Sequence, residues 1–114
     1  MRHFGLVLPL DEQFYRDDHL FVHLRQQVVM LDGEAIFLTR MQHRLLALLV
    51  ESAGQVVPRA SIVAQLWDPQ PQTHTRWLSL QMGGLKKKLG KYGDRYIETV
   101  HGVGYRFWPA LPRR

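Results

Sequence analysis

The clearest pattern of apolar and polar positions in this sequence lies between residues 73 and 91. Apolar residues recur there at intervals of four, three and four, which is the spacing of one face of an α-helix. These residues are Leu78, Met82, Leu85 and Leu89. A step of 100° per residue places a second set on the opposite face: Arg76, Leu80, Gly83 and Lys87. The pattern predicts a helix that buries one face and exposes a basic one.

The segment that follows, residues 97–107, has the pattern of a β-hairpin. β-branched residues precede a turn between Gly102 and Gly104, and Tyr105 begins the returning strand. Glycine suits such a turn because it tolerates positive φ angles. A helix with a basic face, followed by a glycine-tipped basic hairpin, predicts a groove-reading helix and a wing.

The first third of the chain alternates between short extended runs and turns. Apolar runs at residues 20–24, 28–31 and 35–38 predict an antiparallel sheet, and Asp32-Gly33 has the composition of a hairpin turn. Residues 4–8, stopped by Pro9, are a further candidate strand. The acidic residues before Leu20 predict a solvated connection; they are Asp11, Glu12, Asp17 and Asp18.

Two shorter helices are predicted between the sheet and the amphipathic helix. The first begins at Thr39, which has capping-box spacing to Gln42, and ends near Gly54. The second covers about residues 58–67 and ends at the proline-containing loop 68–72. Their predicted core residues are Met41, Leu45, Leu48 and Leu49, then Ile62, Val63, Leu66 and Trp67. The predicted fold class is therefore α+β: a winged helix-turn-helix with an N-terminal antiparallel sheet, a three-helix core and a C-terminal β-hairpin wing.

Charge is divided unequally between the two halves of the 114 residues. Residues 1–57 carry five Lys/Arg and seven Asp/Glu, a net of −2, whereas residues 58–114 carry ten and three, a net of +7. The positive field therefore lies on the half that contains the predicted helix and hairpin, which favours a polyanionic partner. A basic surface that serves only solubility is the alternative.

Several other classes of protein lack support in the sequence. There is no cysteine, and the six histidines are scattered without the spacing of metal ligands, so we expect no metal and no cofactor. No nucleophile elbow, phosphate loop or pair of catalytic acids is present, and we expect no enzyme activity. No apolar run approaches the roughly 18 residues of a membrane span, and no signal peptide is recognisable. A cytoplasmic protein without a membrane partner is expected.

With these elements in order, the sequence resembles the DNA-binding (effector) domain of OmpR/PhoB-type bacterial response regulators, which act in two-component systems. The resemblance covers residues 20–107. It rests on the strings DGEAIFLTRMQHRLLALL, GQVVPRASIVAQLW, LKKKL and IETVHGVGYRF, together with Arg76. The predicted organisation is an N-terminal extension at residues 1–19, a winged-helix domain at residues 20–109 and a tail at residues 110–114.

The resemblance implies a function in transcription regulation by sequence-specific binding to double-stranded promoter DNA, as a tandem homodimer. It implies a four-stranded N-terminal sheet, a recognition helix in the major groove, and a wing at about residues 95–108 on the minor groove or backbone. It also implies contact between RNA polymerase and the loop at residues 68–75. Response regulators carry a receiver domain as well, so the chain is either an excised domain or one that is controlled by other means.

The resemblance also implies roles for single residues. Arg76 matches a phosphate-contacting arginine, and Lys86 matches another basic contact position. Thr99 and Tyr105 match wing positions that touch the DNA backbone. Leu80 stands where the family often has a small apolar residue near a thymine methyl group.

The sequence departs from the family pattern at the centre of the predicted recognition helix. Gly83 and Gly84 occupy positions where well-studied types carry arginines that contact bases and phosphates, and His101 replaces a basic residue at the wing tip. Two interpretations follow. Base reading shifts to Arg76, Trp77, Leu80, Gln81 and the lysines, among which the helical wheel selects Lys87. Alternatively, the domain binds DNA weakly or not at all and uses its flat glycine face as a protein-interaction or dimerisation surface.

The same residues also have plainer interpretations. Trp77 lies at the edge of the buried stripe, where core or dimer packing competes with a DNA contact. Leu80 is either an isolated exposed apolar residue or a contact. The lysines at residues 86–88 either form a solvated helix end, favoured by the helix dipole, or bind phosphate.

Overall fold

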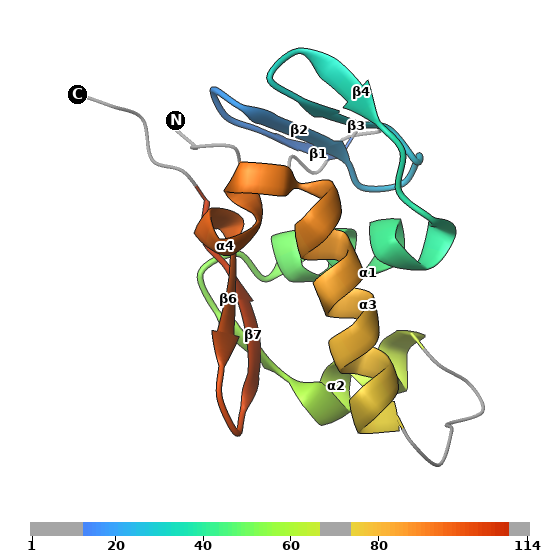
Figure 1. Ribbon diagram of the computed structural model, residues 1–114, viewed down its shortest axis with the longest axis vertical. Coiled ribbons are helices and arrows are strands. Elements are labelled where there is room, and N and C mark those ends of the chain that lie inside the picture. Colours follow the sequence, from blue (N-terminus) through green and yellow to red (C-terminus); the bar gives the residue numbers. More distant parts are fainter. Residues whose placement is uncertain (1–12, 67–73, 110–114) are drawn as a thin grey trace.

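The computed structural model describes residues 13–66 and 74–109, with side chains from residue 76 onward in the second range. The candidate strand at residues 4–8, the core prediction for Trp67, and most of the loop at 68–75 lie outside the described residues. Figure 1 shows the N-terminal sheet at one end of the molecule, the three main helices below it, and the hairpin beside α3.

The N-terminal sheet consists of four antiparallel strands in the order β1-β2-β3-β4. The strands are β1 (Phe14–Arg16), β2 (Leu20–His23), β3 (Val29–Leu31) and β4 (Glu34–Ile36). The hairpin turn predicted at Asp32-Gly33 is confirmed: Leu31 pairs with Glu34, and the two turn residues have φ angles of 52° and 84°. Positive φ at both central positions gives a turn whose twist matches the strands.

One prediction for this region, the solvated connection before Leu20, is wrong in two respects. Strand β1 falls in the segment that was read as an acidic, solvated connection, and Asp17 at its end is half-buried. The Asp17 carboxylate accepts hydrogen bonds from the backbone N–H groups of His19 and Leu20 and from the Tyr96 hydroxyl. The acid is therefore a structural acceptor in the turn between β1 and β2. The sequence pattern did not show it because its partner Tyr96 is 79 residues away.

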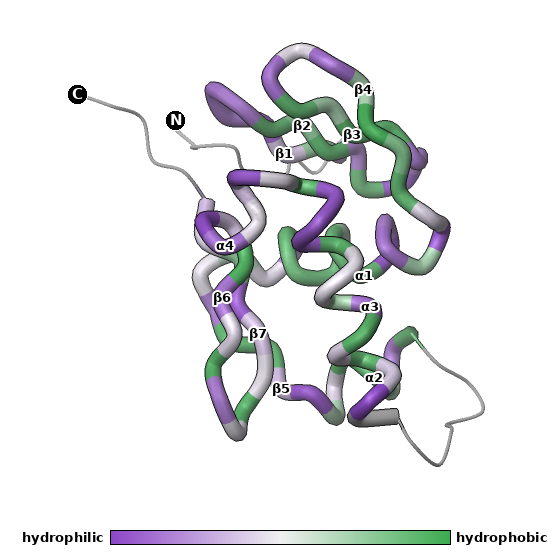
Figure 2. The backbone as a smooth tube through the Cα atoms, in the orientation of Figure 1, coloured by the Kyte–Doolittle hydropathy of each residue, from purple (hydrophilic) through white to green (hydrophobic). Residues whose placement is uncertain are grey.

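The first two helices follow the predicted pattern closely. Helix α1 (Arg40–Glu51) begins with the predicted capping box, in which Thr39 and Gln42 each bond the other's backbone N–H. Helix α2 covers Arg59–Leu66. Every predicted core residue of these helices that is described is buried or packs against the core: Leu45, Leu49, Ile62, Val63 and Leu66, with Met41 and Leu48 partly buried. Figure 2 shows that the second half of α1 is hydrophobic, whereas its first turns are mostly hydrophilic.

Helix α3 (His74–Lys88), which was predicted to be the recognition helix, is shorter than predicted at its C-terminal end. The helical run to residue 91 is interrupted because Gly90 adopts a φ of +61°, which takes the backbone out of the right-handed helical region. A short 3₁₀ turn η1 (Gly90–Tyr92) and a one-turn helix α4 (Gly93–Tyr96) follow, and neither was predicted. This reversal leads the chain from α3 back to the hairpin.

The C-terminal hairpin is confirmed, but it belongs to a larger sheet than expected. β6 (Ile97–Val100) pairs with β7 (Gly104–Phe107), and β5 (Val56–Pro58) adds a third strand in the order β5-β7-β6. Pro58 therefore ends an edge strand and does not open α2; proline, which lacks an N–H group, is tolerated at such an edge. A Cβ atom at Gly104 would lie 2.0 Å from the carbonyl oxygen of Val57. This glycine is needed because the β5 backbone approaches so closely.

Candidate nucleic-acid interface

Helix α3 separates its two faces as its periodicity predicts. Leu78, Leu85 and Leu89 are 0% exposed and Met82 is 2% exposed, which closes the core beneath the helix. The opposite face is exposed at Arg76, Leu80, Gly83 and Lys87. Leu80 is 68% exposed at the middle of this face. No other described residue forms an ion pair or hydrogen bond with Arg76 or Lys87, so both cations face solvent.

Trp77 and Gln81 lie at the edge of the exposed face and are half-buried. Trp77 packs against the hydrophobic core. Its position fits the core-packing interpretation and leaves only part of the indole accessible.

The two glycines of α3 differ in their surroundings. A Cβ atom at Gly83 would meet nothing within 4 Å, whereas one at Gly84 would lie 3.0 Å from Nε2 of Gln42. The Gln42 side chain is held in place because its Oε1 accepts the backbone N–H of Thr39 in the capping box of α1. Gly84 therefore serves the packing of α3 on α1. Gly83 is bare toward solvent, and its lack of a side chain leaves the outer face of α3 open.

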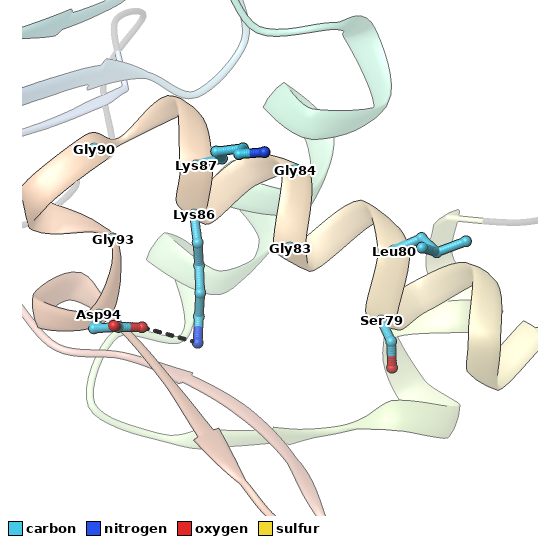
Figure 3. A pocket seen from close by; sticks show the side chains of 9 residues that line it. All are labelled: Ser79, Leu80, Gly83, Gly84, Lys86, Lys87, Gly90, Gly93 and Asp94. Atoms are coloured by element: carbon cyan, nitrogen blue, oxygen red, sulfur yellow. Dashed lines mark ion pairs between the residues drawn. The ribbon is translucent and has the colours of Figure 1, made fainter.

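A pocket of about 540 Å³ lies between the outer side of α3 and the segment that leads into the hairpin. In Figure 3 the side chains of Ser79 and Lys86 project from α3 toward this space, with Gly83 between them and Asp94 opposite Lys86. The residues that line it are Ser79, Leu80, Gly83, Gly84, Lys86, Lys87, Gly90, Gly93 and Asp94. Four of these are glycines, so backbone forms much of the pocket surface.

Lys86 links α3 to both elements on the far side of the pocket. Its Nζ donates a hydrogen bond to Oγ1 of Thr99 in β6 over 3.2 Å and lies 3.4 Å from Oδ1 of Asp94 in α4. The Lys86 side chain is 24% exposed. The two predicted contact residues Lys86 and Thr99 thus lie together, and Asp94, which the sequence analysis did not single out, completes the group.

The hairpin holds its shape through side chains along its length. The Glu98 carboxylate accepts hydrogen bonds from Nε of Arg106 and from Nε1 of Trp108, over 2.9 and 2.8 Å. Bonding to Arg106, and then to Trp108, lowers the pKa of Glu98 below its ordinary value. At the tip, His101 and Val103 are exposed and Gly102 has a φ of +78°.

Tyr105 is placed differently from the other predicted wing residues. It is only 3% exposed, and its hydroxyl accepts a hydrogen bond from Arg59, whose guanidinium also lies 5.2 Å from the ring centroid. Arg59 was not among the residues predicted from the sequence to contact DNA. Arg59 lies at the start of α2, and its backbone N–H donates to the carbonyl oxygen of Val103, so its positive charge lies near the turn of the hairpin.

A polar junction fixes η1 and α4 to the N-terminal sheet at the far end of α3. The Tyr92 hydroxyl donates to Oδ2 of Asp32 over 2.8 Å, and Nδ1 of His19 lies 2.7 Å from Oδ1 of the same carboxylate. The hydrogen bond with His19, and then the one from Tyr92, lowers the pKa of Asp32. Tyr96 is fully buried and donates to Asp17, and burial followed by this hydrogen bond raises its hydroxyl pKa. The junction thereby positions the segment that carries Asp94.

Positive charge is concentrated on the C-terminal part of the described chain. Residues 74–109 carry seven Lys/Arg and two Asp/Glu, a net of +5, and Glu98 is one of the two acids. Figure 2 shows hydrophilic residues gathered where α3 ends. Within the described ranges no group of three or more histidines or acids is arranged to hold a metal ion. No helix among the described residues is long and apolar enough to cross a bilayer.

A three-helix core in which one helix exposes a basic face, with a β-hairpin beside that helix, defines the class of winged-helix DNA-binding domains. The family model described as "Transcriptional regulatory protein, C terminal" matches residues 33–107, and the chain belongs to this family. It is a DNA-binding transcriptional regulator domain of the OmpR/PhoB type, as the resemblance implied.

Individual relatives agree with this assignment. The KDP operon transcriptional regulatory protein KdpE of Escherichia coli is 35% identical over 108 residues, covering 93% of this chain and 47% of its own length. The Thermotoga maritima response regulator DrrB, an OmpR/PhoB homologue, superimposes with a TM-score of 0.76 at 28% identity, covering 83% of this chain and 44% of that one. The RstA DNA-binding domain of Klebsiella pneumoniae, solved with its RstA box, gives a TM-score of 0.75 at 26% identity, over 85% of this chain and 98% of that one. This chain spans about half the length of KdpE and DrrB.

Proposed function

We propose that α3 enters the major groove of a DNA duplex while the β6–β7 hairpin contacts the adjacent minor groove or backbone. A helix and a wing that occupy neighbouring grooves must straddle the phosphodiester strand between them. The pocket between α3 and the η1–α4 segment that leads into the hairpin supports this placement, since Ser79 and Lys86 project into it and the bare Gly83 leaves room for a backbone. The observation that carries the proposal is this open, cation-lined space beside an exposed helix face.

Affinity and specificity are assigned to different residues. Arg76, Lys86 and Lys87 neutralise phosphates, which supplies affinity for any sequence. Leu80, the exposed apolar group at the centre of the face, contacts a thymine methyl group, and the half-buried Gln81 and Trp77 at the edge of the face share in base reading. Gly83 and Gly84 contribute backbone only. Thr99 and His101 contact backbone from the wing, and Tyr105 contributes through its position under Arg59.

The proposed function also includes the assembly of the domain on DNA and a protein partner. The domain binds DNA as a tandem homodimer, and the loop at residues 68–75 contacts RNA polymerase. We take the winged-helix domain to include β1, which pairs with β2, so that it starts by Phe14 and not at residue 20, and continues to residue 109.

Titration of the 114-residue chain against a labelled random-sequence duplex pool tests the proposal. Fluorescence anisotropy at two salt concentrations gives the salt dependence, and sequencing of the bound fraction gives the motif. With three or more phosphates neutralised, we expect log K to fall with log[salt] at a slope of about −3 or steeper. We expect an enriched motif, and a direct repeat within it would indicate a tandem dimer.

The other outcomes of this titration separate the alternatives. Salt-dependent binding without an enriched motif would contradict the proposal that Leu80 and Gln81 read bases. Absence of binding at low salt would contradict the proposal for this chain and favour the glycine face as a protein-interaction surface.

A further inference from the structure

Asp94 is an acidic residue on the side of the domain that we propose faces DNA. It lies close to Lys86, which we propose contacts a DNA phosphate. Its Oδ1 lies 3.4 Å from Nζ of Lys86, and its side chain is 94% exposed. The other acid of residues 74–109 is Glu98, and that carboxylate is already bonded to Arg106 and Trp108. Asp94 thus adds negative charge to the surface that a polyanion would approach.

The placement of Asp94 beside Lys86 is fixed by the backbone. A Cβ atom at Gly93 would lie 2.5 Å from the carbonyl oxygen of Lys86. The backbones of α4 and α3 are therefore so close at this point that only glycine fits at position 93. The next residue in the chain is Asp94. On the other side of α4, the buried Tyr96 is bonded to Asp17, which anchors the short helix to the N-terminal sheet. The backbone of Asp94 is therefore held beside Lys86 by two contacts of α4: the packing of Gly93 on α3 and the hydrogen bond of Tyr96 to Asp17.

Lys86 has a second partner that does not compete with a phosphate. The Thr99 hydroxyl accepts a hydrogen bond from Nζ over 3.2 Å and is neutral, so it keeps the ammonium group between α3 and the hairpin without cancelling its charge. An ammonium group has three N–H donors. A DNA phosphate can take the position of Asp94 while the bond to Thr99 remains.

We propose that Asp94 is an intramolecular competitor of the DNA phosphate for Lys86, and so a positioning residue that lowers affinity for every duplex sequence. This inference rests on the proposed function. In the free domain, Asp94 and Thr99 hold Lys86 at the mouth of the pocket. On binding, the phosphodiester strand displaces the carboxylate from the ammonium group. The domain then relies more on its base contacts for tight binding, because part of its unspecific electrostatic attraction is cancelled.

The test is Asp94→Asn, which keeps the size of the side chain and removes its charge. We expect about two- to fivefold tighter binding, the range of an exposed ion pair, to a selected and to an unrelated duplex alike. The slope of log K against log[salt] should steepen by up to about one. Asp18→Asn is the matched control, since it removes an exposed acid in the turn between β1 and β2 and should leave affinity unchanged.

A double-mutant cycle with Lys86→Gln distinguishes competition from simple repulsion. If Asp94 acts through Lys86, the gain from Asp94→Asn should be largely lost in the Lys86→Gln background. An equal gain in both backgrounds, or no gain in the native one, would overturn the inference. Thermal unfolding of each variant checks that the fold is retained, as expected for an exposed carboxylate.

Failure of this inference can be told apart from failure of the proposed function. If the native chain shows salt-dependent binding and Asp94→Asn leaves it unchanged, only the role of Asp94 is wrong. If neither the native chain nor Asp94→Asn binds the duplex pool at low salt, the proposed DNA contact is wrong and the competitor role is wrong with it.

Discussion

The junction at the C-terminal end of α3 and the outer face of the same helix use polar side chains in different ways. At its C-terminal end, the junction with the N-terminal sheet joins each polar group to another: Asp17 with Tyr96, and Asp32 with His19 and Tyr92. Along its outer face, Arg76 and Lys87 are exposed and have no hydrogen-bond or ion-pair partner among the described residues. Groups that are already bonded within the domain hold the fold, whereas unpaired cations are available to a ligand. Lys86 lies between these cases, because Asp94 and Thr99 already engage it.

The largest expected effect is on the junction. Asp17→Ala should lower the free energy of unfolding by about 2–4 kcal/mol, because it leaves the hydroxyl of fully buried Tyr96 without its acceptor and removes the acceptor for two backbone N–H groups. Urea denaturation measures this loss. Asp18→Ala, its exposed neighbour, should change stability by less than about 0.5 kcal/mol. A loss of similar size in both variants would contradict the distinction between bonded and solvated acids.

The next effect concerns the outer face of α3. Arg76→Ala and Lys87→Ala should each weaken DNA binding roughly tenfold for all sequences and make the salt slope shallower by about one, since each removes a charged donor to phosphate. Both variants should keep the native unfolding free energy. Arg44→Ala, which removes an exposed cation on α1, should leave affinity and salt slope unchanged. If Arg44→Ala weakens binding as much, net charge and not position determines affinity.

A smaller effect separates the two glycines. Gly83→Ala should raise the free energy of unfolding by about 0.5–1 kcal/mol, because alanine favours the helix and its Cβ meets nothing within 4 Å. Gly84→Ala has the same propensity gain, but its Cβ would lie 3.0 Å from Nε2 of Gln42. It should therefore gain less, or lose stability. Thermal unfolding of the two variants side by side measures the difference, and equal gains would show that the Gln42 side chain yields freely.

The smallest effect is on the pH dependence of stability. The pKa of Glu98 is lowered from its ordinary value of 4.5 by its bonds to Arg106 and Trp108. The stabilisation from this group is therefore fully present above about pH 4.5 and is lost as pH falls through the lower pKa of the folded state. Compared with Glu98→Gln, the native domain should lose relative stability only below that pH. A difference between the two proteins that stays constant down to pH 2 would contradict the assignment.

Sequence reasoning succeeded where a residue's environment depends on its near neighbours. The capping box of Thr39 and Gln42, the turn at Asp32-Gly33 and the two faces of α3 all follow from spacings of four residues or fewer, and all are confirmed. It failed for β5, which forms by pairing Val56 with Arg106, and for Asp17, whose partner Tyr96 lies far along the chain. No local pattern records such pairs.

For the candidate interface, the sequence by itself determined the basic helix, the hairpin and the exposed residues of α3, because helical and strand periodicity fix which side chains can share a face. Only the tertiary structure decided how those residues are used. It assigned Gly84 to packing on α1 while leaving Gly83 open, buried Tyr105 beneath Arg59, and placed Lys86 between Thr99 and Asp94. The physical reason is that each of these outcomes depends on the close approach of backbones from separate elements, which spacing along one element cannot specify.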